Sequence, residues 1–271
     1  MPTLTHHGLT IDYLDEGSGP TVVLLHSSVS GNRQWRRLVA DLSTRYRCLA
    51  PNLLGYGGTT PWAGDRRQTL ADAAEVALAI CGLVQGPIRL VGHSWGGAVA
   101  LATAHQLGPR VSHLALYEPM LMGLLAGHGC VDALREAQTV YAAVQKYSDA
   151  GDWLTVAQVF TDYFNGDGAW AATPAERQQA VASQLPSNRH EWDAGAVPIT
   201  ADQFAGIVAQ AIVLCGSDTR LVLSETVAVL AQAFPDWRVV GIPGAGHMGP
   251  LTHSVPVNEC IKAFLADTKA A

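Results

Sequence analysis

The sequence predicts an α/β fold in which helices cover both faces of a mostly parallel central sheet and a helical cap is inserted into the chain. Short, continuous apolar runs alternate with longer helical patterns, and strands buried on both faces of a parallel sheet have this form. The alternation is interrupted once, by a long stretch with helical patterns only. Hydrophobic residues make up 48% of the chain and charged residues 15%, which agrees with a buried sheet and a second buried interface under a cap.

The predicted strands begin with a hairpin. Its two arms, around Thr3–His6 and Leu9–Leu14, flank His7-Gly8, and the stretch Asp15–Pro20 then breaks the chain. Six compact apolar runs follow and are predicted as strands: Val22–His26, Cys48–Leu53, Arg89–His93, His113–Glu118, Ala211–Gly216 and Arg238–Pro243. The helical patterns of this part of the chain are Asn32–Leu42, Leu70–Val84, Gly97–Leu107, Ser224–Phe234 and Val255–Ala266.

The interruption extends from Met120 to about Gln210. It contains three helical patterns, punctuated by Gly166-Asp167-Gly168 and by Leu185-Pro186-Ser187-Asn188: Val131–Gln145, Trp153–Tyr163 and Pro174–Leu185. Ligands of open α/β sheets bind outside the carboxyl ends of the strands, where an insertion can cover them. We therefore expect an α/β core of residues 1–119 and 211–271 and a helical cap of residues 120–210.

Charge and cysteine usage narrow the classes of partner. Lys and Arg number 17 against 23 Asp and Glu, a net charge of −6, so the chain has no cationic surplus for nucleic acid. No apolar run is long enough for a membrane span, and the N-terminus lacks the basic and apolar regions of a signal peptide, which predicts a cytoplasmic protein. The 5 cysteines are scattered, so we expect neither a disulfide framework nor a metal site. A small-molecule substrate is the expected partner, with no cofactor; the sequence leaves the oligomeric state open.

Ser94 is the candidate nucleophile. The predicted strand Arg89–His93 runs directly into the pattern Gly92-His93-Ser94-Trp95-Gly96 and then into an Ala-rich helical pattern. A G-x-S-x-G pattern at a strand-to-helix turn is typical of a serine nucleophile, because glycines at both positions allow the sharp turn. The N-terminus of the following helix presents unpaired N–H groups to a developing anion.

His247 is the candidate base, which a serine nucleophile requires because its hydroxyl is weakly nucleophilic. It follows the last predicted strand, in the segment Pro243–Pro250, and small residues on both sides leave the imidazole free to move. None of the other nine histidines occupies this loop. Its place after Ser94 also agrees with the chain order Ser, acid, His.

These residues resemble those of the α/β-hydrolase-fold superfamily, and in particular of bacterial serine hydrolases and esterases with a helical cap. The resemblance covers essentially the whole chain and is carried by Val22–His26 with Ser27-Ser28, the turn Asn52–Gly57, Gly92–Gly97 and Gly244–Pro250. It implies an α/β-hydrolase fold and an oxyanion hole made by the backbone N–H groups of Ser28 and Trp95. Two positions depart from the family pattern: Ser27 stands where glycine is usual, and Asn52 where aspartate is usual.

The acid that orients the histidine has two candidates. The family usually reads Gly-x-x-Asp after the penultimate strand, but here Thr219 occupies the aspartate position and Asp218 lies one residue earlier. Some α/β hydrolases, including certain haloalkane dehalogenases, carry the acid at the end of the strand that follows the nucleophile's helix. Glu118 occupies that position, 24 residues after Ser94 (118 − 94), and we favour it over the alternative acid Asp218.

The predicted function is hydrolysis of a carboxylic ester through an acyl-enzyme on Ser94. The aromatic, lightly charged cap indicates an apolar acyl or alcohol group. Because fold and catalytic residues do not separate the reactions of this superfamily, amide, lactone or C–C bond hydrolysis is the alternative. A ligand-binding or receptor-like protein with little turnover is the remaining hypothesis, motivated by Thr219 and Ser27 at their unusual positions.

Overall fold

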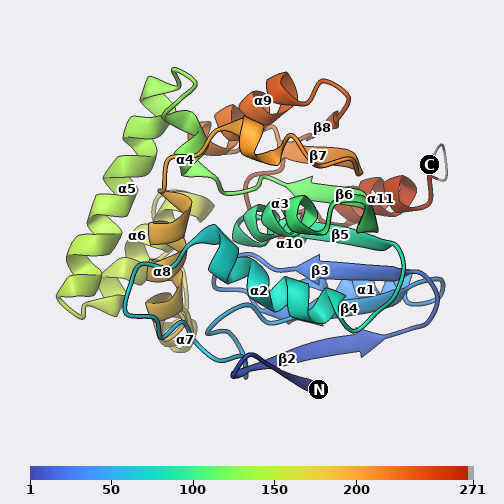
Figure 1. Cartoon of the computed structure of the whole chain (residues 1–271). Helices are drawn as coiled ribbons and strands as arrows, with labels where there is room; N and C mark the ends of the chain where they lie inside the picture. Colours follow the sequence, from blue (N-terminus) through green and yellow to red (C-terminus); the bar gives the residue numbers. More distant parts are fainter. Residues whose placement is uncertain (268–271) are drawn as a thin grey trace.

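An eight-stranded sheet forms the centre of a computed structural model of the chain, which describes residues 1–267 (Figure 1). Across the sheet the strand order is β1-β2-β4-β3-β5-β6-β7-β8. The strands are β1 Thr3–His6, β2 Leu9–Glu16, β3 Thr21–Leu25, β4 Arg47–Pro51, β5 Ile88–His93, β6 Val111–Tyr117, β7 Gln210–Gly216 and β8 Arg238–Ile242. All eight predicted strands are thus present, with small shifts at their ends.

The sheet is mostly parallel, as predicted. β1 and β2 form an antiparallel hairpin and β2 is antiparallel to β4, whereas every other neighbouring pair is parallel. The chain order reverses at β3, which lies between β4 and β5. Such a reversal opens a crevice at the carboxyl ends of the strands, where ligands of open α/β sheets bind.

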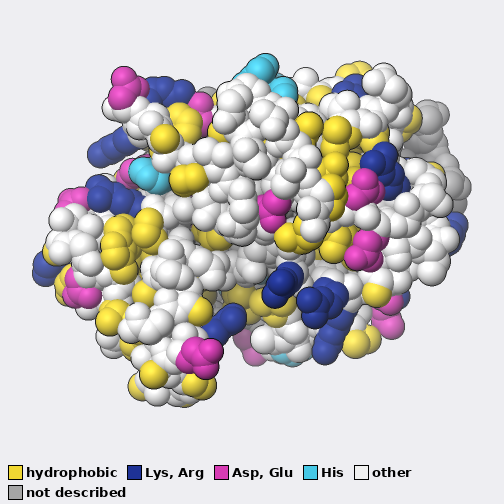
Figure 2. Space-filling model, turned by 90° about the horizontal axis from the view of Figure 1, so that it is seen from below, with side chains coloured by type: hydrophobic (Ala, Val, Ile, Leu, Met, Phe, Trp, Pro, Cys, Tyr) yellow, Lys and Arg dark blue, Asp and Glu magenta, His cyan; other side chains and the backbone are white. Residues whose placement is uncertain are grey.

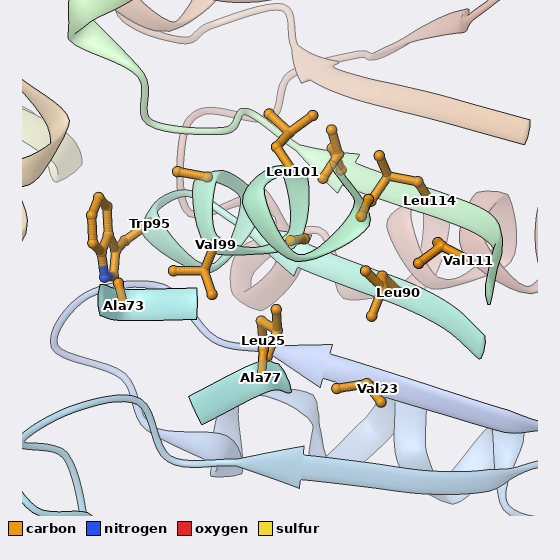
Figure 3. Close-up of a cluster of buried hydrophobic side chains, with 14 of the residues drawn as sticks. Val23, Leu25, Ala73, Ala77, Leu90, Trp95, Val99, Leu101, Val111 and Leu114 are labelled. Carbon is orange, nitrogen blue, oxygen red and sulfur yellow. The ribbon is translucent and has the colours of Figure 1, made fainter. Parts of the chain in front are cut away.

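Helices cover both faces of the sheet, which confirms the predicted fold class. The helical elements of this part are η1 Asn32–Trp35, α1 Arg36–Leu42, α2 Leu70–Cys81, α3 Trp95–Leu107, η2 Gly108–Arg110, α9 Leu221–Ala233, α10 Gly249–Thr252 and α11 Ser254–Leu265. α2, α3 and α9 pack on one face, and α1 and α11 pack on the other. Figure 3 shows side chains of α2 and α3 packed against the first of these faces.

Alternation of side chains along β3 explains why its sequence is continuously apolar. Val23 and Leu25 belong to the core under α2 and α3, whereas Val22 and Leu24 belong to the core under α1 and α11, and all four are fully buried. Successive residues of a strand point to opposite faces, so a strand covered on both sides must be apolar at every position.

Between β6 and β7 the chain is helical. This segment contains α4 Met122–Leu125, α5 Val131–Asp149, α6 Trp153–Asn165, α7 Ala175–Ala182, α8 Leu185–Gly195 and η3 Ala201–Phe204, and residues 120–209, all of them described, form no strand. In Figure 1, α5 to α8 lie on the left, beyond the tips of the β3 and β6 arrows. The segment has a hydrophobic core of its own, to which Met122, Val144 and Trp192 belong.

One element of this segment was predicted wrongly. Leu185-Pro186-Ser187-Asn188 was expected to break the helical pattern, but it begins helix α8. Pro186 lies in the first turn, where a proline is tolerated because the N–H groups of that turn have no partner within the helix. The error concealed a helix that lines the candidate site.

On the face that Figure 2 shows, acidic and basic side chains are interspersed. No helix within residues 1–267 is long and apolar enough to cross a membrane.

Candidate active site

Ser94 lies at a sharp turn between β5 and α3. Its backbone has φ 55° and ψ −120°, a conformation that costs energy for any residue with a side chain. A Cβ at Gly92 would lie 2.5 Å from the carbonyl oxygen of Gly96, and a Cβ at Gly96 would lie 2.3 Å from that of Leu25. Only glycine fits at these two positions, which is the physical reason for the G-x-S-x-G pattern.

This crowding predicts a large difference between two glycine-to-alanine substitutions. We expect Gly96→Ala to lower the free energy of unfolding by about 3 kcal/mol or more, because backbone surrounds the new methyl group. Gly127→Ala is the control: Gly127 is exposed, and a Cβ there would meet nothing within 4 Å. Urea unfolding of both variants and wild type measures the difference, and equal losses would contradict this account of the turn.

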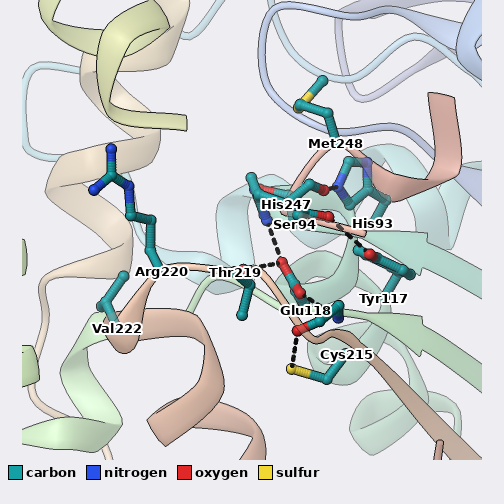
Figure 4. Close-up of polar contacts among 12 residues, drawn as sticks. His93, Ser94, Tyr117, Glu118, Cys215, Thr219, Arg220, Val222, His247 and Met248 are labelled. Carbon is teal, nitrogen blue, oxygen red and sulfur yellow. Dashed lines mark hydrogen bonds and ion pairs between the residues drawn. The ribbon is translucent and has the colours of Figure 1, made fainter. Parts of the chain in front are cut away.

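Ser94, His247 and Glu118 form one continuous chain of polar contacts (Figure 4). Nε2 of His247 lies 2.9 Å from Oγ of Ser94, and Nδ1 lies 2.8 Å from Oε2 of Glu118. The Ser94 and His247 residues are 4% exposed and Glu118 is fully buried. Because a carboxylate only accepts, Nδ1 of His247 carries the proton, and Nε2 is left to accept from the serine hydroxyl.

Glu118 is held at the end of β6 by three donors. Its Oε1 accepts the backbone N–H of Gly216 at 2.7 Å, and its Oε2 accepts both the Thr219 hydroxyl at 2.8 Å and Nδ1–H of His247. These bonds compensate the burial of the carboxylate and fix its orientation. Glu118 has φ 42°, a second positive φ value for a non-glycine residue at this site.

Asp218 is directed elsewhere. Its side chain is exposed and accepts the Ser217 hydroxyl at 2.8 Å, while its backbone N–H donates to Ala245. Thr219, at the position where the family pattern has an acid, instead donates to Glu118. Of the two predicted acids, the structure thus brings Glu118 to His247.

The loop that carries His247 is supported from below. The Tyr117 hydroxyl donates to the carbonyl oxygen of Gly246 at 2.8 Å, and Nε2 of His93 lies 2.8 Å from the carbonyl oxygen of His247. Burial holds the pKa of His93 well below its usual value, so its ring is neutral and donates through Nε2. On the opposite side, the Phe164 ring of α6 packs against the His247 ring with centroids 4.7 Å apart.

The two predicted backbone donors, Ser28 and Trp95, line the same small cavity as Ser94. Trp95 is the first residue of α3, where N–H groups have no helical partner. The neighbouring Ser27 N–H already donates to Oε1 of Gln34, so it is not available to a ligand. His26 fixes this loop: its Nε2 accepts from Leu53 N–H and its Nδ1 lies 2.7 Å from the Ser27 carbonyl oxygen, and burial lowers its pKa to about 4.

The cavity beside Ser94 is small and largely apolar. Its lining residues are Ser28, Ser94, Trp95, Met120, Met122, Phe160, Phe164, Glu191, Trp192 and Gly195. A volume of about 20 Å³ is enough for a water molecule, so a substrate must displace the helices or side chains that close it. Most of the lining comes from residues 120–195, between β6 and β7.

Glu191 is the site residue that sequence reasoning missed. It lies on α8, is 5% exposed, and accepts at Oε2 from the Ser28 hydroxyl at 2.5 Å and from Nδ2 of Asn188 at 3.0 Å. Burial raises its pKa to about 7. The helix was not predicted, and no sequence pattern marks one glutamate as buried; a polar Asn-x-x-Glu pair on one helical face was the available signal.

A metal-ligand arrangement occurs elsewhere on the chain. Ligand atoms of His6, His7 and Glu75 lie within 4.8 Å of one another, but none of these residues lines the cavity beside Ser94.

Known proteins resemble the chain in sequence and in fold. Residues 22–260 match the sequence model of the Alpha/beta hydrolase family. The chain is similar to 2-hydroxy-6-oxo-2,4-heptadienoate hydrolase of Pseudomonas putida, with 26% identity over 96% of this chain and 94% of that protein. Among solved structures it resembles the enol-lactonase of Burkholderia xenovorans (TM-score 0.78, 18% identity, 98% of this chain and 100% of that one). It also resembles a thermophilic esterase of Thermogutta terrifontis (TM-score 0.73, 21% identity, 97% and 96%).

Proposed function

The chain belongs to the alpha/beta hydrolase family, and on that basis we propose that it is a serine hydrolase that cleaves a carboxylic ester through an acyl-enzyme on Ser94. The observation that carries the proposal is the chain of contacts from Ser94 through His247 to Glu118, in which Ser94 lines a small, mostly apolar cavity. A serine, a neutral imidazole and an orienting carboxylate in this order are the parts that acyl transfer requires.

In the first step His247 takes the proton of the Ser94 hydroxyl at Nε2 while Oγ attacks the ester carbonyl carbon. The negative charge that forms on the carbonyl oxygen meets the backbone N–H groups of Ser28 and Trp95. His247 then gives its proton to the departing alcohol as the C–O bond breaks, which leaves the acyl group on Ser94. A water molecule repeats the sequence, releases the acid and restores the hydroxyl, while Glu118 stabilises the imidazolium in both steps.

Residues 120–210 serve as a cap in this proposal. They supply most of the cavity lining, and Phe164 covers the face of His247. A cavity walled by Met120, Met122 and Phe160 favours an apolar group on the substrate. Exclusion of water by this lining also strengthens the electrostatic interactions around the reacting carbonyl group.

Hydrolysis of a C–C bond is the second candidate, because a relative that matches over nearly the whole chain is named a 2-hydroxy-6-oxo-2,4-heptadienoate hydrolase. The compound in that name has no ester or amide bond, so its hydrolysis has to break a C–C bond. A dienoate carries a carboxylate, which a site would bind with a cation. Among the described residues that line the cavity, however, Glu191 is the one ionisable side chain, and no lysine or arginine is present. This charge pattern favours an uncharged or cationic ester over a carboxylate-bearing substrate.

Two measurements test the proposal. We expect the wild-type protein to hydrolyse p-nitrophenyl esters, and a fluorophosphonate to add covalently to one residue, Ser94, as determined by peptide mass spectrometry. The control is Ser224→Ala, which should be labelled like wild type, because Ser224 lies on α9 and does not line the cavity. Absence of both turnover and labelling, together with binding of an apolar ester, would identify a ligand-binding protein instead.

A further inference from the structure

The carboxylate of Glu191 is bound unequally at its two oxygens. Oε2 accepts two hydrogen bonds, from Ser28 and Asn188, whereas Oε1 meets no hydrogen-bond partner among the described residues. Asn188 is itself fixed, because its Oδ1 accepts from Nε1 of Trp192 at 3.0 Å. The carboxylate therefore cannot rotate freely to pair its second oxygen.

An unpaired carboxylate oxygen is costly in this position. Glu191 is 5% exposed, and a buried acceptor without a donor loses the hydrogen bonds that water would give it, which is most costly for a charged group. The Tyr56 hydroxyl faces Glu191 and Ser28 and is the nearest further donor, but its contacts do not reach the geometry of a full hydrogen bond, and Tyr56 does not line the cavity. A donor that completes the hydrogen bonding of the carboxylate can come from the cavity that Glu191 lines together with Ser94.

We infer that Glu191 is a specificity-determining residue, and that the substrate carries a hydrogen-bond donor, a hydroxyl or a protonated amine, which binds Oε1 a few bonds from the ester carbonyl. The inference rests on the proposed ester hydrolysis and adds a substrate class to it. The short distance between the substrate's donor and its ester carbonyl follows from the position of Ser28. The Ser28 side chain donates to Glu191, and the Ser28 backbone N–H faces the carbonyl oxygen in the proposed mechanism.

The electrostatics of the cavity agree with a donor. Glu191 is the charged residue of the described lining, so a protonated amine would neutralise it and a hydroxyl would form a charge-assisted hydrogen bond. Burial raises the pKa of Glu191 to about 7, and a hydrogen bond from either group would stabilise the charged carboxylate and so offset the cost of its burial. The apolar residues of the lining would contact the rest of the substrate.

Isosteric esters provide the test. We expect wild type to hydrolyse methyl 3-hydroxybutanoate or methyl 3-aminobutanoate at least about tenfold more efficiently, by kcat/KM, than methyl 3-methylbutanoate. The hydroxy and amino esters distinguish the two donors. The pair 2-hydroxyethyl butanoate and propyl butanoate tests a donor on the alcohol side in the same way, and a pH-stat measures all five.

Glu191→Gln is the decisive variant. The two donors that fix Oε2 will hold the amide oxygen there, which leaves the amide NH₂ in the place of Oε1 and turns an acceptor into a donor. The preference for the donor-bearing ester should fall to about one or below. Glu136→Gln is the matched control, because Glu136 lies on α5 and accepts from the Tyr163 hydroxyl outside the cavity, and it should keep the preference.

The preference should also be larger at pH 8 than at pH 6, since Glu191 ionises between these values. The titratable group that faces it, Tyr56, stays neutral because its pKa is raised well above its usual value, and Ser28 and Asn188 carry no charge. A ratio of two substrates cancels every effect of pH that is common to both reactions.

The possible failures are distinguishable. If wild type hydrolyses the methyl-branched and propyl esters as well as the donor-bearing ones, and Ser94 is labelled by the fluorophosphonate, the inference is wrong and the proposed function stands. If nothing is hydrolysed and nothing is labelled, the proposed function is wrong. Calorimetric titration of Ser94→Ala with the same esters measures the preference without turnover. Equal dissociation constants for the donor-bearing and the apolar esters would overturn the inference.

Discussion

Ser94→Ala is expected to lower kcat for p-nitrophenyl ester hydrolysis by about 10⁴- to 10⁶-fold, because no other hydroxyl within residues 1–267 meets the imidazole of His247. The fold should be unaffected. The contacts that hold the turn are made by the Ser94 carbonyl oxygen, which accepts from the N–H groups of Gly97, Ala98 and Met120. Stopped-flow and steady-state assays, with thermal unfolding of the same samples, separate the two effects.

Double substitution extends this test. If Ser94 and His247 act as one unit, Ser94→Ala/His247→Ala should be about as slow as either single variant, since each removes the same acyl transfer. Losses that multiply would show that the two residues act independently. Ser224→Ala, with a half-buried hydroxyl that donates to the Leu221 carbonyl oxygen, should retain wild-type activity.

The parts of the fold that could be predicted are those written in local patterns. The inner strands of the sheet are mainly apolar because both of their faces are covered, as β3 shows, and such runs are visible without any knowledge of the partners. The turn at Ser94 was equally visible, because Gly92 and Gly96 meet backbone that no side chain could avoid.

The parts that could not be predicted depend on contacts between distant segments. Whether Glu118 or Asp218 faces His247 is decided by a loop geometry in which the Gly216 N–H and the Thr219 hydroxyl both point to Glu118, and neither sequence position reveals this alone. Glu191 is buried only because α8 packs against the loop that holds Ser28, 163 residues away in the chain. A glutamate on an unrecognised helix carries no local sign of its partner.

Glu118→Gln is expected to lower kcat by about 10⁴-fold, whereas Asp218→Asn should stay within about threefold of wild type. The reason is the tautomer of His247. In wild type, His247 and Thr219 both donate to Oε2 of Glu118, and the Gly216 N–H donates to Oε1. In the Glu118→Gln variant one of these oxygens becomes an NH₂ group, which then faces a donor whichever way the amide is turned. With NH₂ toward Nδ1, the histidine keeps its proton on Nε2 and cannot accept from Ser94.

Asp218→Asn is the matched control, since it makes the same carboxylate-to-amide change on an exposed side chain that bonds only Ser217 among the described residues.

The position of Thr219 allows a stricter test. Its hydroxyl reaches the oxygen of Glu118 that also accepts from His247, so a carboxylate at 219 would approach Nδ1. We expect Glu118→Gln/Thr219→Asp to recover part of the activity that Glu118→Gln loses, measured as kcat on one p-nitrophenyl ester. A larger loss in Asp218→Asn than in Glu118→Gln would instead identify Asp218 as the acid, because only the orienting carboxylate controls the tautomer of His247.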